Sequence, residues 1–461
     1  MTDRGVIVAY ATGKAKELPP RPTFDLRCQR PEHRRNLRIR ADSEVLQSTE
    51  NCRRQPGLRA DCVSIPRIGI TRRNLLVGAG ATLAAAGALT AFPAIAQRKP
   101  LKIGAFISER DAQGVDEMVE PYVSQMRLGL ELAASEINAM GGLVGRPAEL
   151  VYRDDGGSPP SQAAVTAIIA EDGCEAIVSG FVQASPRLVT IRMNALDTPL
   201  PVLHGFWTEG TYCGPIAKHF GPTPKQIVPP IRAYLGNDFQ ARPFSIANWT
   251  SSGRSVSLYM YEALGGAHVG DALVTTPVQG HQPGEFRSVM RWAHEMEANI
   301  IWTAEPRPYA VNVVNQAVEI AVAEGKVFAF LDFSEWQASQ LVPGASVLTC
   351  VPFVASDPSP AVQDFVTRAR AMSGGGLVTH VAFTHYNALM ALKAAMERSG
   401  EASAAAGIAG LEGLTIETAT GPLTLGASGY AAMPMFVAAA ESGKPLSIVQ
   451  KLDQVDPGVS C

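Results

Sequence analysis

The chain has 461 residues, of which 46% are hydrophobic and 18% charged, and its formal net charge is -3. This composition excludes disorder of the whole chain, and the length allows two or three globular domains. Residues 97–461 carry 24 Lys and Arg against 35 Asp and Glu. The main body is therefore acidic, which argues against a nucleic-acid partner.

The first 69 residues are rich in Arg and Pro and follow neither the period of a helix nor that of a strand. We therefore expect no independent fold over residues 1–69, which are either disordered or lie upstream of the true translation start. Val63 is a candidate for an alternative start codon.

An export signal is predicted over residues 70–96. Arg72 and Arg73 precede a run rich in Ala, Gly and Leu, and Ala94 and Ala96 place small residues at both positions of an A-x-A cleavage site. The segment resembles a twin-arginine signal, which predicts recognition by the twin-arginine export machinery, cleavage after Ala96 and a periplasmic protein. The alternative is a membrane anchor, since about 20 apolar residues can span a bilayer. The dominance of Ala and Gly and the cleavage pattern favour the signal.

Four cysteines follow the signal at widely spaced positions and form no CxxC pair. They are Cys174, Cys213, Cys350 and Cys461. This spacing is typical neither of a metal site nor of a disulfide-dense framework. Cys174 is interpreted as a structural residue, and whether any of the four pair is left open.

The mature chain opens with a predicted strand over residues 101–108, a helix over 123–140 and a second strand over 149–155, followed by another helix. The first helix is indicated by apolar residues at helical spacing and by Gly141-Gly142 at its end. This order predicts a parallel, doubly wound α/β layer, in which the loops at the carboxyl ends of the strands meet the ligand.

Two further strands end in loops with candidate binding groups. The strand over 174–180 leads to a helix predicted from Arg187 to about Leu196, with Ser185 and Pro186 at its start, and the exposed backbone N–H groups of a helix start suit a carboxylate or a carbonyl oxygen. An ordinary helix cap is the alternative interpretation. The strand over 200–205 is followed by Phe206 and Trp207, and two adjacent aromatic residues in a loop are harder to explain as core residues.

A Pro-rich segment from Gly221 leads into a second series of strands and helices, which ends in Gly-punctuated hairpins. We therefore predict an α/β fold of two Rossmann-like lobes with parallel sheets, joined by a hinge that the chain crosses several times. The expected first lobe comprises residues 97–221 and 350–412, and the second residues 222–349 and 413–461. A cleft between two such lobes is a usual place for a small ligand, and closure of the lobes around it is a hinge motion.

The sequence resembles the type I periplasmic solute-binding proteins of ABC transporters over about residues 101–449. The resemblance is carried by the stretches GGLVGRPAELVYRDD, SGFVQASPR, FLDFSEWQ and ATGPLTL. It is closest to the branch of receptors for branched-chain amino acids, urea and short-chain amides. This resemblance implies an exported receptor that captures a small polar metabolite (urea, a short-chain amide or an amino acid) and presents it to an inner-membrane ABC transporter permease, without a cofactor.

The same resemblance implies that loops of both lobes contact the ligand. The candidate residues are Ser108, Glu109, Gln183, Ala184, Ser185, Phe206, Trp207, Thr208, Thr250, Ser252, Tyr309, Ser334 and Glu335. The chain departs from the family at Ala184, at Ser252 and at the bulky pair Phe206 and Trp207, so a flatter or more apolar ligand is expected. Glu335 is a candidate for a charge-assisted hydrogen bond to an amine or amide N–H. A solvated acid beside a helix start is the alternative.

Known catalytic motifs are missing from the sequence, which holds no HExxH, no GxSxG, no Walker lysine and no Cys/His cluster at metal spacing. His380 and His385 lie five positions apart, which does not place them on one helical face, and they are interpreted as packing or surface residues. We therefore expect no enzyme and no metal site. The alternatives are a ligand-sensing regulator of the amide-sensor type and a hydrolase on the same fold. A cytosolic regulator has no use for an export signal, which favours the receptor.

Overall fold

The computed structural model describes residues 98–108, 120–155, 162–181, 185–248, 270–274, 284–304 and 308–459, with a few residues between 256 and 263 and the strand β1 (Val8–Ala9). The predicted export signal, with Arg72, Arg73, Ala94 and Ala96, lies outside the described residues, as does the remainder of residues 1–69. Within the described part of the chain, no helix is long and apolar enough to cross a membrane.

The first sheet has five parallel strands in the order β3-β2-β4-β5-β6. They are β2 (Leu101–Ile107), β3 (Ala148–Asp154), β4 (Ala176–Val178), β5 (Val202–His204) and β6 (Ala217–His219). Strand β2 is buried along almost its whole length, as expected for a central strand that is covered on both faces. Because the strand order reverses around β2, the loops after β2 and β4 diverge and leave room for a ligand at this switch point.

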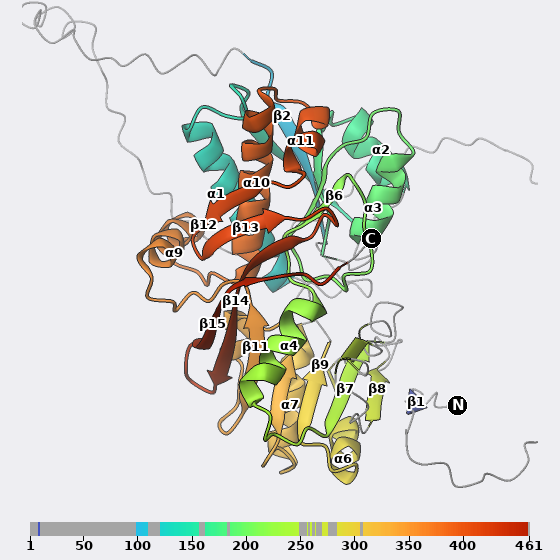
Figure 1. The fold of residues 1–461 in the computed structure, drawn as a ribbon, viewed down its shortest axis with the longest axis vertical. Helices are drawn as coiled ribbons and strands as arrows, with labels where there is room; N and C mark the ends of the chain where they lie inside the picture. Colours follow the sequence, from blue (N-terminus) through green and yellow to red (C-terminus); the bar gives the residue numbers. More distant parts are fainter. Residues whose placement is uncertain are drawn as a thin grey trace, which may run out of the picture. The chain divides into compact units, whose positions relative to one another are not determined.

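Helices cover both faces of the first sheet (Figure 1). One face packs against α1 (Glu120–Ala139) and α10 (His380–Ser399), and the other against α2 (Gln162–Ala170) and α3 (Ser185–Asn194). Helix α11 (Ala404–Leu411) packs on α10. Helix α1 begins three residues before the predicted range of 123–140. It ends, as predicted, at Gly141 and Gly142, whose φ angles of 107° and 78° suit glycine.

The second sheet begins with parallel strands and continues into antiparallel ones. In spatial order the parallel strands are β8 (Gly270–Val274), β7 (Pro243–Asn248), β9 (Ile300–Thr303), β10 (Val327–Phe330) and β11 (Ser346–Val351). The antiparallel strands are β14 (Ala431–Glu441), β15 (Ser447–Val455), β13 (Gly421–Leu425) and β12 (Thr415–Thr418). Strand β1 pairs antiparallel with β8 at the edge of the sheet.

Helix α4 (Pro224–Leu235) covers one face of the second sheet, and α6 (Arg287–Glu295) and α7 (Asn312–Glu319) cover the other. The 3₁₀ turn η3 (Pro308–Val311) precedes α7, and the short helix α8 (Glu335–Ala338) follows β10. The two sheets share one strand order: β2 lies between β3 and β4 in the first sheet, and β7 lies between β8 and β9 in the second. The predicted α/β fold of two Rossmann-like lobes with parallel sheets is therefore confirmed.

The chain passes from one lobe to the other between β6 and α4, between β11 and α9 (Pro360–Ser373), and again through the C-terminal strands. The hairpin of β12 and β13 has contacts with both lobes, because β12 contacts α10 while β13 pairs with β14 of the second sheet. The C-terminal segment returns to the first crossing, where the Thr223 hydroxyl donates to the Pro457 carbonyl at 3.0 Å. The residue limits of the lobes given above stay a prediction.

Two of the four cysteines that follow residue 96 are free and buried, Cys174 and Cys350. Burial raises the pKa of the Cys174 thiol to about 12, so this thiol stays protonated, as expected for a structural residue. Cys213 is disulfide-bonded.

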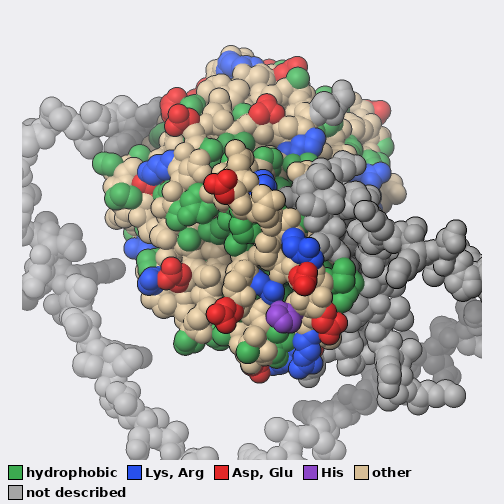
Figure 2. Space-filling model, turned by 60° about the horizontal axis from the view of Figure 1, so that its bottom comes forward, with side chains coloured by type: hydrophobic (Ala, Val, Ile, Leu, Met, Phe, Trp, Pro, Cys, Tyr) green, Lys and Arg blue, Asp and Glu red, His purple; other side chains and the backbone are tan. Residues whose placement is uncertain are grey.

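Charged side chains of both signs are interspersed on the face of the molecule that Figure 2 shows, and hydrophobic side chains gather between them. The coloured residues of this face form no continuous basic stripe.

Helix α10 is packed unusually closely against α1. A Cβ atom added to Gly129 of α1 would lie 2.1 Å from the carbonyl oxygen of Ala382 in α10. Only glycine therefore allows the two helix backbones to approach this closely. Gly410 of α11 lies equally close to α10, because a Cβ atom added to it would be 2.1 Å from the Ala395 carbonyl oxygen. The position of α10 is thus fixed from two sides by backbone contact.

Replacing Gly129 by Ala should force α1 and α10 apart and lower the free energy of unfolding by roughly 1–3 kcal/mol, the usual cost of overpacking. Chemical denaturation measures this change. Ser135→Ala on the exposed face of the same helix is the matched control and should leave stability almost unchanged. Equal stability of the two variants would contradict the close packing.

Candidate functional site

The floor of the candidate site lies at the ends of β2, β3 and β4. Ser108 follows β2 and is fully buried, and its hydroxyl donates to Asp155 Oδ1 at 2.7 Å. Gly180 follows β4, and a Cβ atom at this position would lie 2.5 Å from Asp155 Oδ2. The Asp155 carboxylate therefore fills the space beside Gly180. Ser108, one of the predicted ligand-binding residues, is tied to the neighbouring strand by this hydrogen bond.

Aromatic rings line the ends of β4 and β5. The Phe181 ring lies 4.7 Å from the Tyr122 ring of α1 and 5.3 Å from the Phe206 ring, the second contact being edge-to-face. Phe206 also makes an edge-to-face contact with His385 of α10 at 4.5 Å. We call Tyr122, Phe181 and Phe206 the aromatic wall. Such a wall suits a flat or apolar ligand group.

The three predicted residues after β5, Phe206, Trp207 and Thr208, are all buried. Trp207 is 5% exposed, and its Nε1–H finds no hydrogen-bond partner among the described residues. Thr208 donates its backbone N–H to the Pro222 carbonyl at 3.1 Å, which ties this loop to the first crossing between the lobes. An indole N–H is only a donor, so Trp207 can be satisfied only by an acceptor.

The second lobe contributes the loop between β10 and α8. Ser334 caps α8, and both its backbone N–H and its hydroxyl lie within hydrogen-bond distance of Gln337 Oε1, at 2.7 and 2.8 Å. The hydroxyl predicted to face the ligand is therefore engaged within its own helix cap. Glu335 is partly buried and accepts from the Ala355 backbone N–H at 2.9 Å through Oε1. Its Oε2 is buried and without a partner in the described structure, and burial raises the pKa of this carboxyl group.

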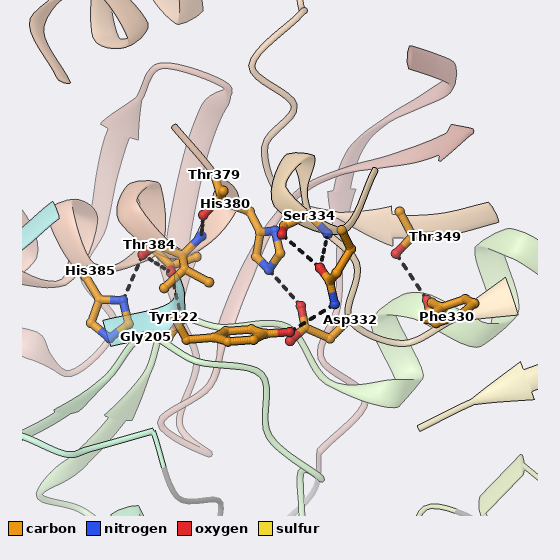
Figure 3. Close-up of polar contacts among 12 residues, drawn as sticks. Tyr122, Gly205, Phe330, Asp332, Ser334, Thr349, Thr379, His380, Thr384 and His385 are labelled. Atoms are coloured by element: carbon orange, nitrogen blue, oxygen red, sulfur yellow. Dashed lines mark hydrogen bonds and ion pairs between the residues drawn. The ribbon is translucent and has the colours of Figure 1, made fainter. Parts of the chain in front are cut away.

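Two side-chain contacts join the lobes beside this loop, as Figure 3 shows. His380 Nε2, at the start of α10, lies 2.9 Å from Asp332 Oδ1 in the loop after β10. Gln337 donates from Nε2 to the Tyr122 hydroxyl at 3.0 Å. Helix α10 also holds the first lobe's loop, because the Thr384 hydroxyl donates to the Gly205 carbonyl at 2.7 Å. The start of α10 therefore contacts the candidate loops of both lobes.

The interpretation of His380 as a packing or surface residue was incomplete, because the structure pairs it with an acid 48 positions away. His385 does pack in the core, where its ring occupies the space that a Cβ atom of Gly205 would need. No short-range pattern pairs His380 with Asp332. The sequence did contain a signal for Ser334: Ser-x-x-Gln at a helix start is the pattern of a capping box.

Several predicted ligand-binding residues cannot be placed. Glu109, Gln183, Ala184, Thr250 and Ser252 lie outside the described residues. Ser185 begins α3 and Tyr309 lies in η3, but the positions of their side chains are not described. The assignment of these seven residues to the ligand site stays a prediction, as does that of the six candidate residues whose surroundings are described above. No group of three or more His, Cys, Asp or Glu side chains that could hold a metal ion occurs among the residues that the structure describes.

Comparison with known proteins places the chain in a family. The model of the periplasmic binding protein family matches residues 117–445. No curated protein matches the sequence.

The fold is shared with solved solute-binding proteins of low sequence identity. One is the solute-binding protein of an ABC transporter from Rhodopseudomonas palustris BisB5 in complex with 3,4-dihydroxybenzoic acid (TM-score 0.67, 15% identity, 78% of this chain and 99% of that chain). A second is the leucine-, isoleucine-, valine-, threonine- and alanine-binding protein from Brucella ovis in a closed conformation (0.65, 16%, 79% and 99%). A third is the branched-chain amino acid transporter substrate-binding protein from Streptococcus pneumoniae in complex with isoleucine (0.61, 17%, 77% and 99%).

Three histidines behind the aromatic wall are buried: His204, His219 and His385. His204 Nδ1 lies 2.8 Å from the Ser179 hydroxyl, and the His219 ring stacks on Tyr430 at 4.1 Å. Burial lowers the pKa of all three, to about 3 for His219 and about 4 for His385. Near neutral pH all three imidazoles are therefore uncharged.

The fold should lose stability as the pH falls below about 6.5, because the unfolded chain then binds protons that the folded histidines do not. The stabilisation is complete above pH 6.5 and is lost as the pH falls towards the folded pKa values. Each histidine should contribute a loss of about 1.4 kcal/mol between pH 7.5 and 5.5. Chemical denaturation at the two pH values measures it.

His219→Phe is the informative variant, since a phenyl ring can keep the stack on Tyr430 and does not titrate. It should remove one histidine's share of the pH dependence, again about 1.4 kcal/mol. An unchanged difference between pH 7.5 and 5.5 in this variant would show that His219 does not titrate in the way its burial implies.

Proposed function

This chain belongs to the periplasmic binding protein family, and we propose that it is the exported solute receptor of an ABC transporter whose ligand is a small carboxylate with an apolar body. The proposed ligand class comprises amino acids and aromatic acids. Urea and short-chain amides, which the sequence resemblance implied, are the alternative ligands. The observation that carries the proposal is the aromatic wall at the ends of β4 and β5, beside the contacts between the lobes.

The wall supports an apolar ligand body. Tyr122, Phe181 and Phe206 come from three different segments, yet their rings form a continuous series of contacts. Aromatic faces and edges in such a series accept a flat ring or a branched aliphatic chain with large burial of apolar surface. The bulky Phe206 thus fits the expectation of a flatter or more apolar ligand.

Unpaired donors support a carboxylate. Trp207 in the loop after β5 and Trp302 near the end of strand β9 are both buried, and neither indole nitrogen meets an acceptor within the described ranges. Buried polar groups are almost always hydrogen-bonded, so donors without partners at the carboxyl ends of two sheets favour a ligand that brings acceptors. The predicted contact at the start of α3, at Ser185, would add backbone N–H groups to them.

Glu335 bears on the choice between the two kinds of carboxylate. Its Oε2 has no partner within the described ranges, so it can accept from the ammonium group of an amino acid, as the sequence suggested. An aromatic acid has no such group. Solved proteins of the same fold carry isoleucine in one case and 3,4-dihydroxybenzoic acid in another, so both kinds of ligand fit this architecture.

Export to the periplasm follows from the predicted signal over residues 70–96 and agrees with the family. The disulfide at Cys213 supports it, since disulfides persist mainly in oxidising compartments. The partners of this receptor are then the twin-arginine export machinery and, after export, the permease of an inner-membrane ABC transporter. The ATP-driven transporter supplies the energy, so the receptor itself needs no catalytic residue.

A thermal-shift panel of amino acids, hydroxybenzoates, urea and short-chain amides tests the ligand class. A ligand at 100 times its dissociation constant should stabilise the protein by about 2.7 kcal/mol through mass action. Stabilisation by urea alone would agree with a receptor function but would contradict a carboxylate ligand. Turnover of an amide without stabilisation by any compound would favour the hydrolase instead.

Trp207→Phe tests the site, because it keeps an aromatic ring and removes only the indole donor. Loss of a hydrogen bond to a charged ligand group should weaken binding roughly ten- to a hundredfold, as seen by titration calorimetry. Trp292→Phe is the control, since Trp292 packs on Phe244 in the second lobe at 4.9 Å. Equal affinities of both variants and the wild type would show that the ligand binds away from Trp207.

A further inference from the structure

The contacts between the lobes are made by side chains that are withdrawn from water. His380 is 3% exposed and Asp332 7%, and both Gln337 and Tyr122 are buried. The first lobe supplies His380 and Tyr122, and the second supplies Asp332 and Gln337. These are therefore not surface contacts that solvent or salt would weaken.

Gln337 and His380 are each held in position by contacts within their own lobe. Ser334 fixes Gln337 Oε1 through its backbone N–H and hydroxyl, which leaves Nε2 to reach the Tyr122 hydroxyl. His380 is the first residue of α10, whose position the close contact with α1 fixes. Because each of the two pairs has one member that is ordered within its own lobe, less side-chain entropy is lost when the lobes meet.

The contacts also connect to the candidate ligand site. Tyr122 accepts the hydrogen bond from Gln337 through its hydroxyl, while its ring packs on Phe181 at 4.7 Å. Glu335, which immediately follows Ser334, accepts from Ala355 in the second crossing between the lobes. Separation of the lobes would break the Gln337–Tyr122 hydrogen bond, whose acceptor belongs to the aromatic wall.

We propose that the pairs Asp332–His380 and Gln337–Tyr122 form an interlobe latch, which favours the closed arrangement in the absence of ligand and thereby sets the ligand affinity. The inference rests on the proposed receptor function. The four residues are positioning residues, because they act through the fraction of molecules that are closed. Apparent affinity falls in proportion to that fraction, so the latch acts on every ligand of the cleft equally.

Small-angle X-ray scattering of the protein without ligand tests the latch directly. His380→Ala and Tyr122→Phe should each increase the radius of gyration relative to the wild type, because the closed form loses a contact. His380→Gln keeps a side-chain donor for Asp332 and should restore much of the compactness. His294→Ala, an exposed histidine on α6, is the control and should scatter like the wild type.

Tyr122→Phe removes one oxygen atom and keeps the ring on Phe181, so this variant should fold even if His380→Ala does not. Thermal unfolding shows whether each variant is folded. Isoleucine and 4-hydroxybenzoate are the ligand probes. Whichever binds the wild type should bind Tyr122→Phe and His380→Ala more weakly and dissociate faster, by roughly tenfold or more for His380→Ala, which leaves the buried Asp332 Oδ1 without this partner.

Unchanged scattering in both folded variants overturns the latch. A larger radius of gyration with unchanged ligand affinity overturns the effect of the latch on binding and leaves the latch only a structural role. If neither probe binds the wild type while the variants still expand, the latch stands and the proposed ligand class fails, so the two proposals are tested separately.

Discussion

The hydrogen bond from the Thr384 hydroxyl to the Gly205 carbonyl fixes helix α10 to the loop that carries Phe206 and Trp207. It acts at the point where the His385 ring occupies the space beside Gly205, so any side chain at position 205 would displace the helix. One turn earlier, His380 reaches Asp332 of the second lobe. The start of α10 therefore holds the candidate ligand loop of one lobe against the loop of the other, and the geometry of the site depends on it.

The chemistry of the site follows from burial. The three histidines behind the aromatic wall are kept uncharged because water is excluded from them, and the same exclusion raises the pKa of the Glu335 carboxyl group. Around them, the wall is apolar and the unpaired indole groups offer only donors. A ligand with an apolar body and a carboxylate complements this combination, whereas a small neutral ligand such as urea leaves the aromatic surface uncovered.

Local sequence patterns predicted the fold, whereas the assignment of residues to the ligand site stays a prediction. Glycine at positive φ stops α1 where the Gly141-Gly142 pair indicated, and alternating strands and helices required parallel sheets with covered faces. The aromatic pair after β5 became a candidate because it stands directly after a strand. The pairing of Asp332 with His380 was not predictable, because it joins two lobes across 48 positions and no local period relates them. Ser334 was predicted to face the ligand although its capping pattern indicates that the hydroxyl turns towards its own helix.

The central claim is that the ligand lies between the lobes against the aromatic wall. A crystal structure of the protein with the most strongly stabilising compound tests it most directly. The account predicts ligand density in contact with Phe181 and Phe206, with a carboxylate oxygen within hydrogen-bond distance of Trp207 Nε1. Ligand density elsewhere, such as beside Phe365 and Asn387 in the pocket between α9, α10 and the β12 hairpin, with an empty site at the wall, would contradict it.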